Sequence, residues 1–324
     1  MSDTDSDLEQ QTAMEQVMKD VFYQSYDNFI QNFALNLPYI WNDPSARELD
    51  HTSNPNYNKN EHSAIVIGRG PTVKKKKQLE LLAESDYQGN IVCCDGKLIE
   101  ALNAGVTPDK FPNYFVVTID PYPQVLAHYD DVIVDKFGSK IKGVFTTVTD
   151  PSVQERARKA GIKIHWFHSL FDYNEGKKSF NQISALMVRA KNHTNGLPAI
   201  QTGGNVGTSS WFVSWKILNC STVCLIGINH GYGEDDSWED HIKLSNIDKK
   251  SKNFQKWFKR AYNPDFDCYF IQDPIFQFYS LELKEFISRS PDWVTTINAT
   301  EAGAIFGEKI KSMKFEQFLK EFHM

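Results

Sequence analysis

Six short apolar runs alternate with helical patterns between residues 63 and 227. Runs such as Tyr114-Phe-Val-Val are continuously apolar, which is typical of parallel strands that are covered on both faces. This alternation predicts an α/β fold, in which a doubly wound, mostly parallel, Rossmann-like sheet lies between helices. The predicted strands are 63–67, 90–94, 114–118, 142–146, 162–167 and 222–227, and the predicted helices are 73–85, 97–104, 123–129, 152–160, 181–192 and 206–218.

An amphipathic helix is predicted before this core. Its apolar residues recur every three or four positions, and it should end before Pro38 because proline interrupts the backbone hydrogen bonds of a helix. A stripe this aromatic is expected to be buried, either on the core or on a second copy of the chain in a homo-oligomer. Residues 42–61 are rich in Asn, Pro, Ser and charge, which is typical of a linker. The stripe consists of Met18, Phe22, Tyr26, Phe29 and Phe33.

The composition narrows the class of protein. A chain of 324 residues with 41% hydrophobic residues can bury a sizeable core. Its net charge of −6 gives no electrostatic case for binding nucleic acid, so a small-molecule ligand is favoured. Five cysteines without a repeated C-x-x-C pair argue against a disulfide framework or a zinc ribbon. The N-terminus is acidic where a signal peptide is basic, and no run of about 18 apolar residues occurs, so we expect a cytoplasmic protein without a membrane span.

The first predicted strand leads into a glycine turn and then a helix. Gly68 and Gly70 permit close approach of the backbone, and Thr72 stands where the helix begins. A helix N-terminus leaves N–H groups unpaired and carries partial positive charge, so the turn is predicted to bind phosphate. The turn lacks the third glycine of a dinucleotide-binding motif and does not match the P-loop pattern. The lysines at 74–77 either reach phosphate oxygens or solvate the exposed side of the helix.

Polar residues directly follow other predicted strands. Asp95 follows the second strand, Asp120 the third, and Asn229 and His230 the last. Ligands of parallel α/β sheets bind beyond the carboxyl ends of the strands, so these side chains are predicted to gather at one ligand site. Each also has a structural alternative, since Asp95 begins a common Asp-Gly turn pair and Asp120 could cap a helix.

A second glycine-rich turn precedes the predicted helix 206–218. Its glycines keep side chains away from the turn, and its polar residues offer donors at a helix N-terminus. We expect either a second phosphate or sugar site, or a tight turn where a helix begins close to the sheet. The residues concerned are Gly203, Gly204, Asn205, Gly207 and Thr208.

An acidic stretch, residues 233–241, follows the last strand and carries five carboxylates within seven residues. It lacks the residue order of a calcium loop, so a solvated loop is the simplest interpretation. One or two of its acids could instead help hold Mg²⁺ over a phosphate. His241 becomes a candidate general base if this loop closes on a substrate.

Six blocks follow one another along the chain: Gly68-Arg-Gly-Pro-Thr72, Asp95-Gly-(x8)-Gly105-Val-Thr-Pro-Asp109, Val116-Val-Thr-Ile-Asp-Pro121, Gly203-Gly-Asn-Val-Gly-Thr208, Leu225-Ile-Gly-Ile-Asn229 and Asn298-Ala-Thr-Glu-Ala-Gly303. In this order they resemble the 6-hydroxymethylpterin diphosphokinase MptE-like family. That family also includes the motility accessory (Maf) glycosyltransferases and is similar in core fold to bacterial sialyltransferases. The resemblance covers roughly residues 62–307, and its specificity lies in the order of the blocks.

The diphosphokinase branch of the family implies one reaction. Diphosphate would move from ATP to the hydroxymethyl group of a pterin, with Mg²⁺ as cofactor. Gly68, Gly70 and Thr72 would hold phosphates, and Asp95 and Asp120 would hold the metal or the ribose, with Asp120 as a catalytic residue.

The Maf branch implies another reaction, in which a nine-carbon sugar leaves a CMP donor for a hydroxyl acceptor. His241 or His230 would then be the base, and Gly204, Asn205 and Thr208 would contact the phosphate of the donor. Gly203, Gly207 and Asn229 complete the predicted nucleotide contacts.

The chain departs from both branches. Only Asp120 stands where the diphosphokinase has D-L-D-G, and Asn229 stands where both branches usually carry Asp. With fewer carboxylates the metal site is weaker. Diphosphoryl transfer needs such a site, because metal ions neutralise the charge that develops in phosphoryl transfer. Three blocks look more like Maf, although the long extra domains of typical Maf proteins are absent from this chain.

We therefore predict, first, Mg-ATP-dependent diphosphoryl transfer to 6-hydroxymethyl-dihydropterin. The alternatives are a Maf-like or sialyltransferase-like glycosyltransferase that uses a CMP-activated sugar, and a non-catalytic nucleotide-binding protein. The chain would comprise an acidic tail, amphipathic helix and linker (1–60), a nucleotide-binding α/β core (61–232), and an acidic loop with a helical C-terminal region that completes the fold (233–324).

Overall fold

The main feature of the computed structural model is one parallel sheet. The structure describes residues 25–50, 62–170, 184, 196–236 and 258–322. The nine-stranded sheet has the order β12-β11-β7-β1-β2-β3-β4-β5-β6, and its neighbouring strands pair in parallel, which confirms the predicted fold class. The strands are β1 (Ser63–Ile67), β2 (Asn90–Cys94), β3 (Tyr114–Thr118), β4 (Lys142–Thr146), β5 (Lys163–Leu170), β6 (Ala199–Gln201), β7 (Thr222–Ile226), β11 (Thr295–Asn298) and β12 (Ile310–Ser312).

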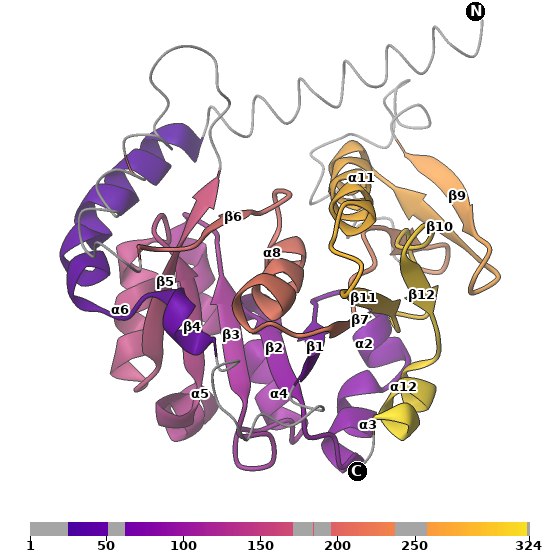
Figure 1. Ribbon diagram of the computed structural model, residues 1–324, viewed down its shortest axis with the longest axis horizontal. Coiled ribbons are helices and arrows are strands. Elements are labelled where there is room, and N and C mark those ends of the chain that lie inside the picture. The colour runs from indigo at the N-terminus through magenta and orange to yellow at the C-terminus, as the bar shows by residue number, and fades with distance from the viewer. Residues whose placement is uncertain (1–24, 51–61, 171–183, 185–195, 237–257, 323–324) are drawn as a thin grey trace, which may run out of the picture.

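The order of the strands reverses at the centre of the sheet. From β1 the chain adds β2 to β6 toward one edge, and it then returns to place β7 on the other side of β1 (Figure 1). The strands β11 and β12 extend the sheet beyond β7. Ligands of doubly wound sheets bind at such a reversal, so the carboxyl ends of β1 and β7 mark the expected site.

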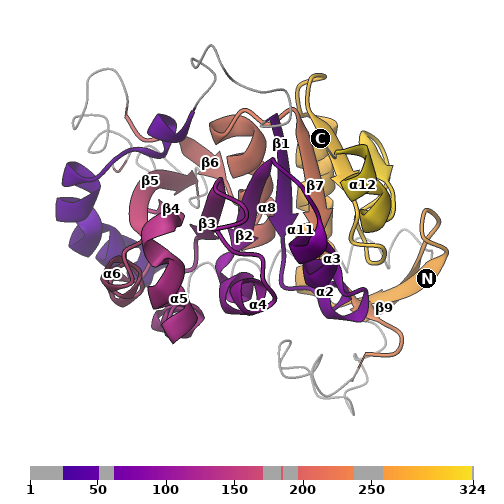
Figure 2. The ribbon, with the colours of Figure 1, turned by 90° about the horizontal axis from the view of Figure 1, so that it is seen from below.

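Helices cover both faces of the sheet because alternate residues of each strand point to opposite sides. Ile65 and Ile67 belong to one core cluster, and Ala64 and Val66 to the other. Figure 2 shows α4, α5 and α6 along one side of the sheet and α8 on the other. The first cluster contains α3 (Gln78–Glu84), α4 (Leu98–Asn103), α5 (Val132–Phe137) and α6 (Pro151–Lys159), and the second contains α8 (Val206–Phe212) and α11 (Pro274–Ser288).

Strands were predicted more accurately than helices. The predicted bounds of β1 to β4 are confirmed, whereas the predicted helix 73–85 is wrong as a single helix. It is divided into α2 (Thr72–Lys75) and α3, because Lys77 between them adopts a left-handed conformation with φ +50°. The segment Pro123–His128 is a 3₁₀-helix, and the helix after β6 ends in the π-helical turn Val213–Ile217. The predicted helix 181–192 lies almost entirely outside the described residues.

The N-terminal helix ends later in the chain than predicted, and of its predicted aromatic stripe Phe33 is buried in the first core cluster while Phe29 packs against that cluster. Residues 25–42 are helical, so the expected end before Pro38 is wrong. Its buried side chains include two asparagines, whereas Tyr26 and Phe29 are only partly buried. Met18 and Phe22 of the predicted stripe lie outside the described residues. The buried residues of this helix are Ser25, Asn32, Phe33, Asn36 and Ile40.

The first part of the predicted linker is packed against the sheet. Ala46 and Leu49 of the 3₁₀-helix Ala46–Leu49 are buried in the second core cluster. The backbone N–H of Trp166 in β5 donates to the carbonyl oxygen of Pro44, 3.0 Å away. Residues 44–49 therefore extend the core, although their composition is polar.

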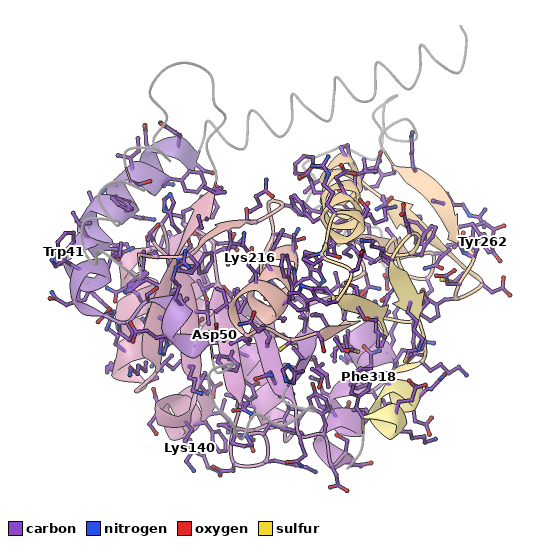
Figure 3. All side chains as sticks on the ribbon, viewed as in Figure 1. Trp41, Asp50, Lys140, Lys216, Tyr262 and Phe318 are labelled. Carbon is purple, nitrogen blue, oxygen red and sulfur yellow. The ribbon has the colours of Figure 1, made fainter. Side chains whose placement is uncertain are left out.

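The C-terminal region contains more strands than the predicted helical extension. Besides β11 and β12, a small antiparallel sheet forms from β8 (Tyr232–Gly233), β10 (Cys268–Gln272) and β9 (Lys259–Asn263). The last helix, α12 (Phe315–Glu321), is as expected, and its apolar face is buried beside α3. Figure 3 shows Phe318 of α12 at this contact and Trp41 at the far side of the molecule. None of the described helices combines the length and hydrophobicity that crossing a bilayer requires.

Candidate functional site

The turns that follow β1 and β7 are packed directly against each other. The backbone N–H of Gly68 donates to the oxygen of Ile226, and that of Gly70 donates to the oxygen of Gly227, both over 2.8 Å. A Cβ atom on Gly70 would lie 2.0 Å from Oδ1 of Asn229 and 2.6 Å from the Gly227 oxygen. The two predicted glycines are therefore needed for contact between protein segments, whether or not a phosphate also binds there.

Thr72 and Asn229 complete this contact. The Thr72 hydroxyl donates to Oδ1 of Asn229 over 2.9 Å, and both side chains are buried. The segment after β11 supports the same turn, since the Ala304 N–H donates to the Asn229 oxygen over 2.8 Å and the Ile228 N–H donates to the Thr300 hydroxyl over 3.2 Å. Two of the predicted phosphate ligands are thus engaged with each other.

A carboxylate pair lies at the ends of the next two strands. Asp95, after β2, is 2% exposed. Its Oδ1 accepts from the Gly96 N–H over 2.6 Å, and its Oδ2 is buried without a hydrogen-bond partner among the residues that the structure describes. The pKa of Asp120 is raised to about 7, mainly by burial and further by the negative charge of Asp95. The structure therefore brings together the two acids that were predicted to hold a metal, and the repulsion between them favours a bound cation or proton.

His128 belongs to the same cluster, although the sequence analysis did not identify it. Its Nδ1 lies 3.7 Å from Oδ1 of Asp95, and it opposes the rise in the pKa of Asp120. Its side chain is 25% exposed, so a ligand can reach the ring. The segment Pro123–His128 packs against the residues that follow β2 and so places His128 beside Asp95, and no local signal in the sequence points to this.

The second glycine turn adjoins the first through Ile228. A Cβ atom on Gly207 would lie 2.8 Å from Cδ1 of Ile228, and the same atom would be 2.4 Å from a Cβ on Gly68. Asn205 caps α8, with its Oδ1 accepting from the Thr208 N–H over 2.9 Å. Its Nδ2 donates to the Gly203 oxygen and the Thr208 hydroxyl, so these polar side chains are engaged within the turn.

Aromatic residues of α11 lie beside both the second glycine turn and His230. A Cβ atom on Gly204 would lie 2.7 Å from Cε1 of Tyr279. Burial raises the pKa of the Tyr279 hydroxyl, and the negative charge of Asp120 raises it further. The His230 ring is buried 6.5 Å from the Phe276 ring in a stacked arrangement, and within the described part of the chain its Nδ1 has no hydrogen-bond partner. Burial lowers the pKa of His230 to about 3, so it is neutral at pH 7 and a weak base.

The acidic stretch after β7 contacts the lysine run after β1. Nζ of Lys75 lies 3.0 Å from Oδ1 of Asp235 and 2.5 Å from Oδ1 of Asp236. At least one of the lysines is therefore paired with an acid of the chain. His241 lies outside the described residues. Within the described part of the chain, no three His, Cys, Asp or Glu side chains form a group that could hold a metal by themselves.

The geometry thus defines a doubly wound α/β protein with a polar cluster at the point where the strand order reverses. The family model described as 6-hydroxymethylpterin diphosphokinase MptE-like matches residues 31–235, which is more than half of the chain. The chain therefore belongs to the 6-hydroxymethylpterin diphosphokinase MptE-like family, and this membership supports a transferase.

Among solved structures, the chain is similar to a Maf glycosyltransferase from Magnetospirillum magneticum AMB-1, with a TM-score of 0.53 and 15% sequence identity. The match covers 79% of this chain and 34% of that protein, so the chain spans about a third of its length. At this identity the likeness shows the shared fold. A search of the curated proteins finds no significant match.

Proposed function

We propose that this protein transfers a diphosphoryl group from ATP to the hydroxymethyl group of a dihydropterin, with Mg²⁺ as cofactor. The hydroxyl oxygen would form a bond to the β-phosphorus as the bond from that phosphorus to the α-phosphate oxygen breaks, so AMP leaves and the hydroxyl proton is released. The observation that carries the proposal is the pairing of Asp95 and Asp120 at adjacent strand ends, beside the turns at the reversal point. Family membership supports the same reaction class.

The carboxylate pair fits a hard cation. Asp95 has a buried Oδ2 without a partner, and Asp120 is repelled by the charge of Asp95. Mg²⁺ is commonly held by one or two carboxylates together with substrate phosphates and water, so a third protein ligand is not required. When bound, the metal would neutralise charge on the transferred phosphates. Asp95 and Asp120 would hold it, while the backbone beside Gly68 and Gly70 would orient the nucleotide.

Thermal unfolding with added ligands tests this proposal. We would compare ATP, GTP, CMP and a CMP-sugar, each with and without Mg²⁺, and expect a Mg²⁺-dependent stabilisation by ATP. A ligand at 100 times its dissociation constant adds about 2.7 kcal/mol, which shifts the melting temperature by several degrees. Stabilisation by ATP that does not depend on Mg²⁺ would argue against the proposed metal site.

Two variants locate the effect. Asp120→Asn and Asp95→Asn should each abolish the Mg²⁺-dependent shift and the transfer of diphosphate to the pterin. Asp109→Asn is the matched control, because Asp109 is an exposed carboxylate paired with Lys140 and no part of the cluster. The proposal fails if all three variants behave alike.

A second candidate is glycosyl transfer from a CMP-activated sugar, which the position of His128 favours. An imidazole whose Nδ1 faces the buried Asp95 carboxylate can be oriented to accept a proton from an acceptor hydroxyl. The buried, neutral His230 is less suited to this role than His128, and His241 stays a prediction. Stabilisation by CMP without metal, together with loss of glycosyl transfer in His128→Gln, would support this candidate. If none of these nucleotides stabilises the protein, both candidate reactions lose support and the ligand is a different one.

A further inference from the structure

Two asparagines of the N-terminal helix reach the loops at the carboxyl ends of β3 and β4. Nδ2 of Asn32 donates to the oxygen of Pro121 over 2.9 Å and to that of Val148 over 3.0 Å. Nδ2 of Asn36 donates to the oxygen of Thr147 over 3.2 Å and to that of Thr149 over 2.6 Å. Both asparagines are 5% exposed or less.

Such residues are costly in the middle of a helix. Asparagine is a poor helix former, and a buried amide is destabilising unless it is hydrogen-bonded. Here the spacing of four residues places both side chains on one face of the helix. Each side-chain amide donates its two N–H protons to two different loop carbonyls. The pair therefore fastens the helix to the sheet through polar contacts, in addition to the apolar contacts of the buried Phe33 and Ile40.

The Asn32 contact lies directly beside the carboxylate pair. Pro121 follows Asp120 and has no N–H, so its carbonyl oxygen is its only backbone group that can take part in a hydrogen bond, and Asn32 donates to it. A further contact holds the next residue, since the hydroxyls of Ser25 and Tyr122 are hydrogen-bonded. The loop that carries Asp120 thus follows directly from β3 and is held by the N-terminal helix at Pro121 and Tyr122.

We propose that Asn32 is a positioning residue for Asp120, and that the N-terminal helix is accordingly part of the functional site rather than a separate appendage. This proposal rests on the proposed function only in that Asp120 acts on the ligand. Asn32 does not touch the ligand itself. It fixes the direction in which the chain leaves β3, and so the place of the Asp120 carboxylate relative to Asp95.

Asn36 provides a matched control. It lies on the same face of the same helix, is also buried, and also donates two hydrogen bonds to loop carbonyls. Its partners, Thr147 and Thr149, belong to the loop after β4, which carries none of the proposed site residues. Loss of either asparagine should therefore weaken the helix contact, but only loss of Asn32 should disturb Asp120.

The test compares Asn32→Ala with Asn36→Ala in the full chain, by hydrogen exchange without ligand and by titration with Mg-ATP. In Asn32→Ala we expect amide exchange in residues 122–129 to rise at least about tenfold and Mg-ATP binding to weaken about tenfold. In Asn36→Ala, exchange should rise in residues 147–150, with Mg-ATP affinity within about twofold of the unchanged protein. Asn32→Ser keeps one donor, so its amide exchange and its Mg-ATP affinity should lie between those of Asn32→Ala and the unchanged protein. It replaces Asn32→Ala in the test if that variant does not fold.

Equal exchange and equal affinity in the Asn32 and Asn36 variants would overturn the proposal. The two readouts also separate it from the proposed function. If the unchanged protein does not bind Mg-ATP, the diphosphokinase assignment fails, and the exchange of residues 122–129 still decides whether Asn32 holds the Asp120 loop.

Discussion

The Thr72 hydroxyl donates a hydrogen bond to Oδ1 of Asn229 over 2.9 Å, and this bond joins the helix after β1 to the turn after β7. The same oxygen would collide with any side chain at Gly70. Asn229 therefore sets the distance between the two central turns of the sheet. The neutral amide of Asn229 accepts this bond, at a position where both branches of the family usually carry Asp.

Replacing Thr72 by Val should destabilise the protein. Valine has the same shape but no hydroxyl, so Oδ1 of Asn229 loses this donor in a buried place, at a cost of about 1–3 kcal/mol. The free energy of unfolding in urea measures the loss. Thr72→Ser keeps the hydroxyl and should retain more of the stability, and equal losses in the two variants would contradict the role assigned to the bond.

Gly70→Ala should lower stability by about 1–3 kcal/mol, because the new Cβ overlaps Asn229 and the Gly227 backbone. Gly96→Ala is the control. A Cβ atom there would lie 3.2 Å from Cδ of Arg69 and 3.3 Å from Cε1 of His128. Both are outer atoms of side chains that can move by a few tenths of an ångström, so the change should stay within about 1 kcal/mol. Denaturation of both variants under one set of conditions compares them, and an equally stable Gly70→Ala would show that the two turns are not packed this tightly.

The stability of the protein should depend on pH through Asp120. Its pKa is raised from 3.8 to about 7, so between these values the folded protein binds more protons than the unfolded chain. Stability from this group is therefore fully present below about pH 4 and is lost as the pH rises through about 7. Asp120→Asn removes the titration, so the stability of the variant relative to the unchanged protein should rise by about 3 kcal/mol between pH 5 and pH 8. A relative stability that does not change with pH would refute the shifted pKa.

His230 should have the opposite effect. Its pKa is lowered from 6.5 to about 3, so the unfolded chain takes up the proton first and stability falls as the pH drops below about 6.5. His230→Asn removes the titration, and asparagine tolerates the left-handed conformation of this position, φ +43°. We expect the variant to lose less stability than the unchanged protein between pH 7 and pH 4.5 in thermal unfolding. Parallel losses would mean that His230 is not buried in its neutral form.

Most of the parallel sheet could be predicted from the sequence. The runs that form β1 to β4 are short, apolar and buried on both faces, so their bounds follow from local composition. Because ligands of parallel sheets bind beyond the carboxyl ends of the strands, the sequence also predicted that Asp95, Asp120 and Asn229 lie at the same edge of the sheet. The roles of these residues as nucleotide or metal ligands stay predictions.

The contacts of the N-terminal helix could not be predicted, because its partners are distant in sequence. Asn32 and Asn36 bond to carbonyl groups about 90 to 115 residues away, and nothing local distinguishes them from surface asparagines. His128 joined the cluster for a similar reason, since its place beside Asp95 depends on how the chain turns back after β3.

The sequence by itself determined the class of fold and the edge of the sheet where polar side chains meet, because hydrophobic periodicity and glycine placement act over a few residues. Only the tertiary structure decided which of those side chains are already engaged with the protein and which are unpaired. Thr72 bonds to Asn229, whereas Oδ2 of Asp95 has no hydrogen-bond partner in the described ranges, and that difference arises from burial and from hydrogen bonds between segments far apart in the chain.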